Sequence, residues 1–294
     1  MVDLEAAYRA IRADVGAIWL DRDMIDVAGP DAEVYLQGQL SQDVAALATG
    51  ESAFSFLLQP QGKVDAFVRV VRHAPDRFTL DVDGGFGASV LARLNRFKLR
   101  TKVDIEPLDW RCLAVRGPRA HEVATDGIPA DWPGLAGVDR LGPDPVPPAG
   151  VLLCPPDAYE VVRIEAGVPA MGKELTERTI PAEAGRHVID RAVSFTKGCF
   201  TGQELVARID SRGGNVPRLL RGVVSPDAVP PSEAQVEVDG TGVGTLTSVA
   251  ARPSSDGAVA LAYVKRDVTP PAPATLRWAG GEARARLEVL PLVS

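Results

Sequence analysis

The chain has 294 residues, of which 46% are hydrophobic and 24% are charged, a balance typical of a folded protein rather than a disordered one. This length predicts two or three domains. The net charge of −7 argues against broad, non-specific binding to a nucleic-acid backbone.

Targeting and metal-binding patterns are absent from the sequence. No apolar run reaches the roughly 18 residues that a membrane span needs, and residues 1–15 carry five charged side chains where a signal peptide would be apolar. The three cysteines, Cys112, Cys154 and Cys199, are far apart and odd in number, so they predict neither a disulfide framework nor a paired-cysteine metal site. We therefore expect a cytoplasmic protein with no intrinsic metal and no membrane partner.

The first part of the chain predicts short helices and strands in alternation. Residues 6–13 are typical of a short helix, and residues 15–26 of two short strands around a charged turn. A second helix is expected from Pro30, which suits a first-turn position, to Leu40.

A hairpin and a strand–helix pair follow. Residues 54–58 and 63–72 alternate as strands, and the linker from Gln59 to Gly62 has the proline and glycine positions that a type I turn prefers. A further strand is expected at 78–82 and a helix at 87–99.

The rest of the chain, from residue 112 onward, has a different sequence pattern. A strand at 112–116 leads into a Pro- and Gly-rich stretch, residues 127–156, for which we expect loops and short strands. Beyond Pro217 the chain consists of short strand-like runs with glycines between them, and this spacing predicts a small antiparallel barrel. These runs are residues 236–238, 244–249, 258–264, 274–278 and 284–290.

These elements predict an α+β protein of three parts. We expect a discontinuous N-terminal α+β domain of residues 1–49 and 108–215. Residues 50–107 would form an α+β unit inserted into it, and residues 216–294 the C-terminal barrel.

The segment around Cys199 carries the most chemical information. Thr201 and Glu204 have the spacing of a helix capping box, and a helix should follow. With Thr201 as the N-cap, Cys199 would lie just before the positive end of that helix, with Lys197 close by. Both features favour the thiolate, which is the nucleophilic and metal-binding form. The alternative is a buried structural cysteine, since cysteine is among the most buried residue types.

A second candidate is Glu165. It would lie in the last turn of a helix that ends at Gly167, where the helix dipole disfavours a negative charge. Such a carboxylate needs a partner, and an arginine is the commoner one, with a polar ligand as the alternative.

The sequence Lys-Gly-Cys-Phe-Thr-Gly-Gln-Glu from Lys197 to Glu204, followed by Ala207-Arg208, resembles the signature of the YgfZ family. This resemblance implies a folate-binding protein that supports the assembly or repair of iron–sulfur enzymes, with Cys199 as its reactive thiol. Bacterial members are also linked to tRNA methylthiolation. The expected partners are folate and iron–sulfur client or assembly proteins, without direct nucleic-acid binding.

Four further segments, residues 27–32, 35–40, 113–118 and 163–167, resemble motifs of the wider aminomethyltransferase superfamily. The resemblance implies a three-lobed fold around a central folate pocket, closed by the C-terminal barrel. The expected cofactor is tetrahydrofolate or a derivative.

The same resemblance assigns roles to individual residues. Glu165 corresponds to a glutamate that accepts hydrogen bonds from the pterin ring. Asp65 aligns with an aspartate of a Gly-x-x-Asp hairpin that sits near the reactive nitrogen of tetrahydrofolate. A second aspartate follows there in true aminomethyltransferases, and Ala66 replaces it here, which disfavours transferase catalysis.

A cluster of arginines follows the cysteine segment. It would form a cationic patch for a polyglutamate tail or for a partner's acidic face, with a solvated, salt-bridged surface as the alternative. Its members are Arg208, which we expect to contact the cofactor, and Arg212, Arg218 and Arg221.

Three functions are consistent with these patterns. The first is a folate-dependent factor for iron–sulfur cluster assembly or repair, with Cys199 and Lys197 at its reactive site. The second is a tetrahydrofolate-dependent aminomethyltransferase of glycine cleavage. The third is a non-catalytic scaffold that has lost folate.

Overall fold

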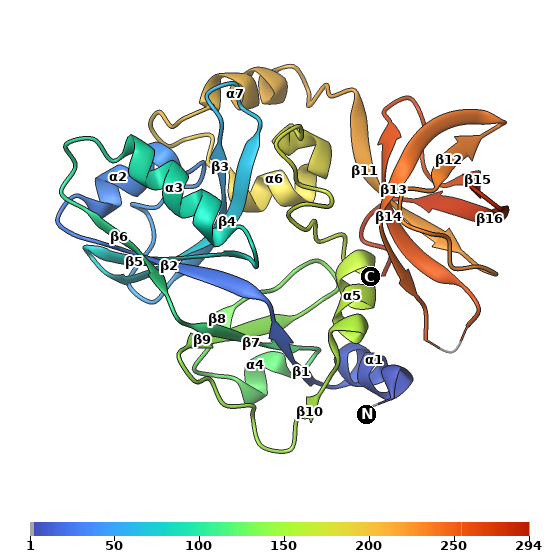
Figure 1. Cartoon of the computed structure of the whole chain (residues 1–294), viewed down its shortest axis with the longest axis horizontal. Coiled ribbons are helices and arrows are strands. Elements are labelled where there is room, and N and C mark those ends of the chain that lie inside the picture. Colours follow the sequence, from blue (N-terminus) through green and yellow to red (C-terminus); the bar gives the residue numbers. More distant parts are fainter. Residues whose placement is uncertain (1–2, 254, 294) are drawn as a thin grey trace.

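The computed structural model describes residues 3–253 and 255–293 and consists of two five-stranded sheets and a closed barrel (Figure 1). The first sheet has the order β10-β1-β7-β9-β8. Its strands are β1 (Gly16–Leu20), β7 (Arg111–Arg116), β8 (Ile128–Pro129), β9 (Gly137–Gly142) and β10 (Leu152–Leu153).

The second sheet has the order β3-β4-β5-β2-β6. Its strands are β2 (Arg22–Ala28), β3 (Ser52–Leu58), β4 (Val64–Ala74), β5 (Arg77–Asp83) and β6 (Asp104–Leu108). The structure differs here from the predicted inserted unit of residues 50–107. Strand β2 comes from the segment assigned to the first domain, yet it pairs with β5 on one side and β6 on the other. Its backbone groups need partners on both edges, and strands distant in the chain supply them.

Helices cover these sheets and connect them. They are α1 (Leu4–Ala13), α2 (Ala32–Gln39), α3 (Gly87–Phe97), α4 (Ala120–Val123), α5 (Pro156–Glu165), the 3₁₀ helix η1 (Pro181–Ala184), α6 (Arg186–Ala192) and α7 (Gln203–Ser211). No helix among the described residues is long and apolar enough to cross a lipid bilayer.

The predicted C-terminal barrel is confirmed. Six antiparallel strands close in the order β11-β14-β13-β12-β15-β16, so no edge is left open. The strands are β11 (Arg218–Ser225), β12 (Gln235–Val238), β13 (Thr241–Ala251), β14 (Ala258–Lys265), β15 (Ala272–Trp278) and β16 (Gly281–Glu288).

The hydrophobic core is divided between the two halves of the molecule. The largest cluster of buried side chains joins the two sheets with the helices, and a separate cluster fills the barrel. A small third cluster includes Val161 and Ile164 of α5 together with Leu261 and Tyr263 of β14. Figure 1 shows α5 between the barrel and the first sheet, so this helix joins the barrel to the rest of the chain.

Candidate functional site

The segment that carries Cys199 is a loop between α6 and α7 that lies against the C-terminal end of α2. The amide of Thr201 donates to the carbonyl of Gly38 over 3.1 Å, and the amide of Ser194 donates to the carbonyl of Ser41 over 3.0 Å. Phe200 is buried, whereas Cys199 is exposed. The alternative of a buried structural cysteine is therefore wrong for Cys199, although it holds for the other two cysteines, which are buried.

Lys197 fixes this loop through its ammonium group. Its Nζ donates to three backbone carbonyls, those of Gln37 (2.7 Å), Leu40 (2.7 Å) and Gln42 (2.8 Å). Burial lowers the pKa of Lys197 to about 8, against the opposing charge of Asp43. All three ammonium donors are occupied by carbonyls, which positions the loop, and the catalytic role predicted for Lys197 stays a prediction.

The predicted helix cap is wrong. Helix α7 begins at Gln203, and its N-cap is Gly202 in a left-handed conformation (φ 80°), without a side-chain capping bond. The Gln203 side chain instead accepts a hydrogen bond from the amide of Phe200 over 3.0 Å. A Cβ on Gly202 would lie 2.6 Å from the carbonyl oxygen of Gln59, so the β3–β4 turn packs directly on this glycine. Cys199 consequently precedes the N-cap by three residues and not by the two that we expected.

A central cavity of about 140 Å³ lies between the two sheets and α5. Aromatic side chains form part of its wall, and two of them, Phe54 and Phe67, are stacked with ring centroids 5.4 Å apart. The ring of Trp132 tilts against Phe54 at 5.1 Å, and Tyr159 of α5 lines the same space.

The charged wall of this cavity is a buried network of arginines and aspartates. Arg69 lies within ion-pair distance of Asp81 and Asp139, the latter 2.8 Å away, and Arg116 binds Asp139 over 2.7 Å. Arg22 binds Asp81 as well. Burial by itself would raise the pKa of Asp139, but the charges of Arg116 and Arg69 outweigh it and lower that pKa.

Two buried donors of this network make no hydrogen bond with the described residues, and one of them, Arg69 Nη1, still lies 2.8 Å from Asp139 Oδ2. Arg116 Nε is buried and finds no hydrogen-bond acceptor among the described residues, although the same side chain lines the central cavity. A buried polar atom left unpaired is costly, so this position favours a ligand or a water molecule with an acceptor atom.

The predicted cofactor residues lie elsewhere. Glu165 is buried and accepts hydrogen bonds from the Tyr8 hydroxyl (3.0 Å to Oε1) and from Arg12 Nε (2.9 Å to Oε2), both on α1. Asp65 accepts from Arg93 of α3 over 3.1 Å, and Arg208 lies exposed on α7. None of the five predicted residues, all within the described chain, lines the central cavity. The folate contacts assigned to three of them stay predictions.

The predicted arginine patch is also divided in the structure. Arg218 binds Glu183 over 3.1 Å and stacks on the ring of Tyr263, so it is a salt-bridged residue at the start of the barrel. No cluster of three or more His, Cys, Asp or Glu side chains suited to a metal ion occurs in residues 3–253 and 255–293.

The sequence did contain a signal for the buried network. Arg69 stands between Val68 and Val70, and Asp81 between Leu80 and Val82, each a charged residue with apolar neighbours on both sides. A buried charge requires a partner, and the register of β4 and β5 pairs these two residues directly.

The chain is similar to known proteins over most of its length. Residues 3–133 match the family model described as the GCVT N-terminal domain. A tRNA-modifying protein YgfZ of Edwardsiella ictaluri is 30% identical over 300 residues, which cover 91% of this chain and 88% of that protein. This chain belongs to the YgfZ family. The predicted family is thus confirmed.

Two other known proteins are similar to this YgfZ-family chain. A mitochondrial iron–sulfur cluster assembly factor IBA57 homolog of Neurospora crassa is 27% identical over 254 residues, covering 75% of this chain and 55% of that protein. The crystal structure of glycine cleavage system aminomethyltransferase T from Bartonella henselae superposes with a TM-score of 0.81 and 21% identity, covering 99% of this chain and 89% of that one. The latter confirms the predicted aminomethyltransferase-like fold.

Proposed function

We propose that this YgfZ-family chain supports the assembly or repair of iron–sulfur clusters by presenting the Cys199 thiol to a partner protein, with the pterin ring of a folate held at the central cavity. One relative is named as a tRNA-modifying protein and another as an iron–sulfur cluster assembly factor. The partners that the proposal requires are iron–sulfur client or assembly proteins in the reducing cytoplasm.

The exposed thiol on an anchored loop is the observation that carries this proposal. Lys197 binds three carbonyls, Phe200 is buried, Gly202 packs against the β3–β4 turn and Gln203 accepts a backbone amide. Cys199 stands among them and remains exposed. The neighbours hold the backbone in place while the sulfur stays accessible, and a thiolate is the form of cysteine that attacks electrophiles and binds metals.

The central cavity has the donors, acceptors and rings that a pterin needs. The pterin edge presents N–H donors, for which Asp83 and Asp139 are acceptors, and a carbonyl oxygen, for which Arg116 Nε is an unpaired donor. Phe67 and Trp132 supply apolar ring faces. A bound tetrahydrofolate would supply nitrogen atoms that accept a one-carbon unit, while these residues bind and orient its ring.

A rescue experiment tests the role of the thiol. In a strain that lacks its own YgfZ-type protein, we expect the wild-type chain to restore the activity of cluster-dependent enzymes and Cys199→Ala to fail. Thr196→Ala, a change in the same exposed loop, is the matched control and should rescue fully. Full rescue by Cys199→Ala would refute the proposal, and rescue of glycine-cleavage flux alone would establish an aminomethyltransferase instead.

A binding experiment tests the folate site separately. Titration calorimetry with tetrahydrofolate should show saturable binding to the wild-type chain and binding at least tenfold weaker to Trp132→Leu. Asp65→Asn and Glu165→Gln test the positions predicted from the sequence, and we expect neither to weaken binding as much as Trp132→Leu does. No saturable binding by the wild-type chain would favour a scaffold that has lost folate.

A further inference from the structure

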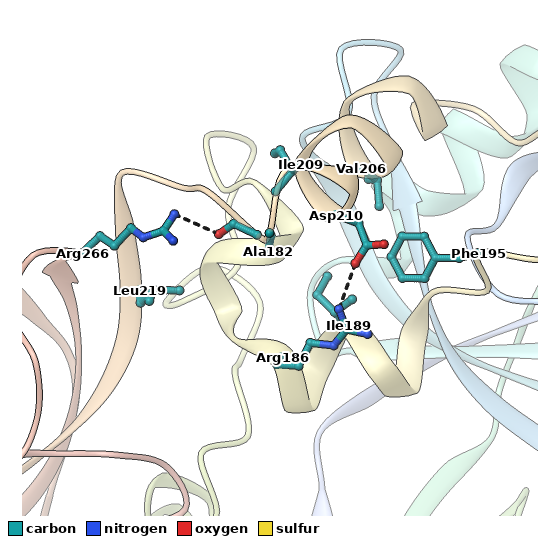
Figure 2. Close-up of a pocket in the computed structure, with 11 residues that line it drawn as sticks. Ala182, Arg186, Ile189, Phe195, Val206, Ile209, Asp210, Leu219 and Arg266 are labelled. Atoms are coloured by element: carbon teal, nitrogen blue, oxygen red, sulfur yellow. Dashed lines mark hydrogen bonds and ion pairs between the residues drawn. The ribbon is translucent and has the colours of Figure 1, made fainter.

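A second cavity, of about 430 Å³, lies among η1, α6, α7 and the first strand of the barrel (Figure 2). It shares no lining residue with the central cavity described above. One of its walls is Phe195, which belongs to the loop that carries Cys199. The cavity is thus at the boundary between the barrel and the rest of the chain, a frequent position for small-molecule sites.

The walls of this cavity are mainly apolar. Ile189 of α6 and Val206 and Ile209 of α7 line it with their largely buried side chains, and Leu219 of β11 faces them. Phe195 is 43% exposed, an unusual degree for so large an apolar ring. The volume lies within the range of about 300 to 1,000 Å³ that small-molecule sites have.

Two arginines lie at the margin of the cavity, and only one of them is neutralised by a carboxylate. Arg186 binds Asp190 over 2.6 Å and Asp210 over 2.8 Å. Arg266 donates from Nη1 to the carbonyl of Gly214 and to the side-chain amide oxygen of Asn215, both uncharged acceptors. No carboxylate among the described residues lies within ion-pair distance of Arg266. Figure 2 shows this guanidinium on the barrel side, away from the Arg186–Asp210 pair.

From this arrangement we infer that the cavity binds an amphipathic organic anion, with an apolar body between α6, α7 and β11 and one carboxylate against Arg266. The apolar walls favour hydrocarbon, and each methylene that they bury strengthens binding about fourfold. The planar guanidinium of Arg266 keeps donors for a carboxylate, because its bonds to the protein are made by Nη1 alone.

Dodecanoate is a suitable probe, used below its micelle concentration in titration calorimetry with the whole chain. We expect saturable binding of one molecule per chain, and octanoate should bind at least tenfold more weakly. Dodecyltrimethylammonium, which has the same hydrocarbon chain and a cationic head, should also bind at least tenfold more weakly. Absence of saturable dodecanoate binding, or equal binding of the cationic probe, would overturn the inference.

Substitutions in the second cavity test whether dodecanoate binds there. Leu219→Trp fills the cavity and should abolish dodecanoate binding, while Arg266→Gln keeps the cavity and should weaken binding about tenfold. Arg284→Gln removes another exposed arginine of the barrel, one that does not line the cavity, and should leave binding unchanged. Circular dichroism verifies that each variant is folded.

Two results would contradict this assignment. The first is wild-type affinity in Arg266→Gln, which would show that the anionic head does not meet this guanidinium. The second is displacement of dodecanoate by tetrahydrofolate, which would place the probe in the central cavity.

Discussion

At the scale of single residues, Lys197 explains how the loop around Cys199 is held. Its ammonium meets three carbonyls at the C-terminal end of α2, where unpaired carbonyl groups and the helix dipole both favour a positive charge. Three donors thus meet three acceptors. The residue two positions before the thiol thus determines the course of the loop.

Lys197→Met should therefore both destabilise the chain and abolish its rescue of cluster-dependent enzymes. The change leaves three carbonyls without their charged donor, and we expect the free energy of unfolding to fall by about 2 kcal/mol. Urea denaturation measures this loss. Lys63→Met, an exposed lysine in the β3–β4 turn, is the control and should change stability little. Unchanged stability in Lys197→Met would show that the three hydrogen bonds do not hold the loop.

At the scale of elements, the cysteine loop and the β3–β4 hairpin interlock through two glycines. Gly202 and Gly62 both have φ near 80°, and their positions leave no room for a side chain. A Cβ on Gly62 would lie 2.6 Å from the Cβ of Leu205 in α7. The start of α7 and the hairpin turn are therefore fixed against one another by backbone contact.

Gly202→Ala should disrupt this contact, because alanine disfavours the left-handed conformation and its Cβ would meet the Gln59 carbonyl. We expect a loss of about 2 kcal/mol in the free energy of unfolding. Gly198→Ala is the matched control within the same motif, since nothing lies within 4 Å of the added Cβ and the backbone has no positive φ. Thermal denaturation of the two variants compares them, and equal stabilities would contradict the interlock.

Helix α5 carries a carboxylate, Glu160, whose ion pairs should make the stability of the chain depend on pH. Burial would raise the pKa of Glu160, but Arg163 and Lys173 outweigh it and lower the pKa to about 2. A carboxyl whose pKa is lower in the folded state stabilises it above the unfolded pKa, near 4.5, and loses that effect as the pH falls toward 2.

Glu160→Gln should thus reduce the free energy of unfolding by about 2 kcal/mol at pH 7. The difference from the wild-type chain should shrink as the pH falls between about 4.5 and 2. Denaturation at a series of pH values measures it. A difference between Glu160→Gln and the wild-type chain that stays constant with pH would contradict the assignment.

At the scale of the whole molecule, Glu174 connects the barrel to the α/β half. It is fully buried, and its Oε1 accepts hydrogen bonds from Thr247 and Ser248 of β13, both over 2.6 Å. Its Oε2 accepts the amide of Ala170 over 2.9 Å and lies 3.3 Å from Arg163 of α5. One carboxylate thus makes polar contacts with both halves.

Glu174→Ala should weaken the connection between the halves. The substitution removes one of the two carboxylates that neutralise the buried charge of Arg163. Removal of one partner from a buried ion pair costs about 3–5 kcal/mol. Limited proteolysis should then cut the segment between α7 and β11 sooner than in the wild-type chain. Equal cleavage rates would show that apolar packing alone holds the barrel in place.

The sequence could predict features that depend on neighbouring residues in the chain, but not features that depend on contacts between distant segments. The β3–β4 hairpin, the Cys199 segment and five of the six barrel strands are local patterns and were recognisable as such, whereas β11 was not predicted as a strand. The partners of β2 were not, since they depend on which distant strands meet at its edges. The residues that line the central cavity were missed for a related reason. Arg69 and Asp139 lie in different sheets, so their pairing exists only once the sheets face one another.

The three cysteines differ in exposure, so chemical labelling of the native chain can be compared directly with labelling of the denatured chain. Cys112 and Cys154 are buried, and Cys199 is exposed. A maleimide should therefore add once to the native protein and three times after denaturation, as intact-mass spectrometry would show. A fluorophore or spin label could then be attached at the proposed reactive position without removing any other cysteine.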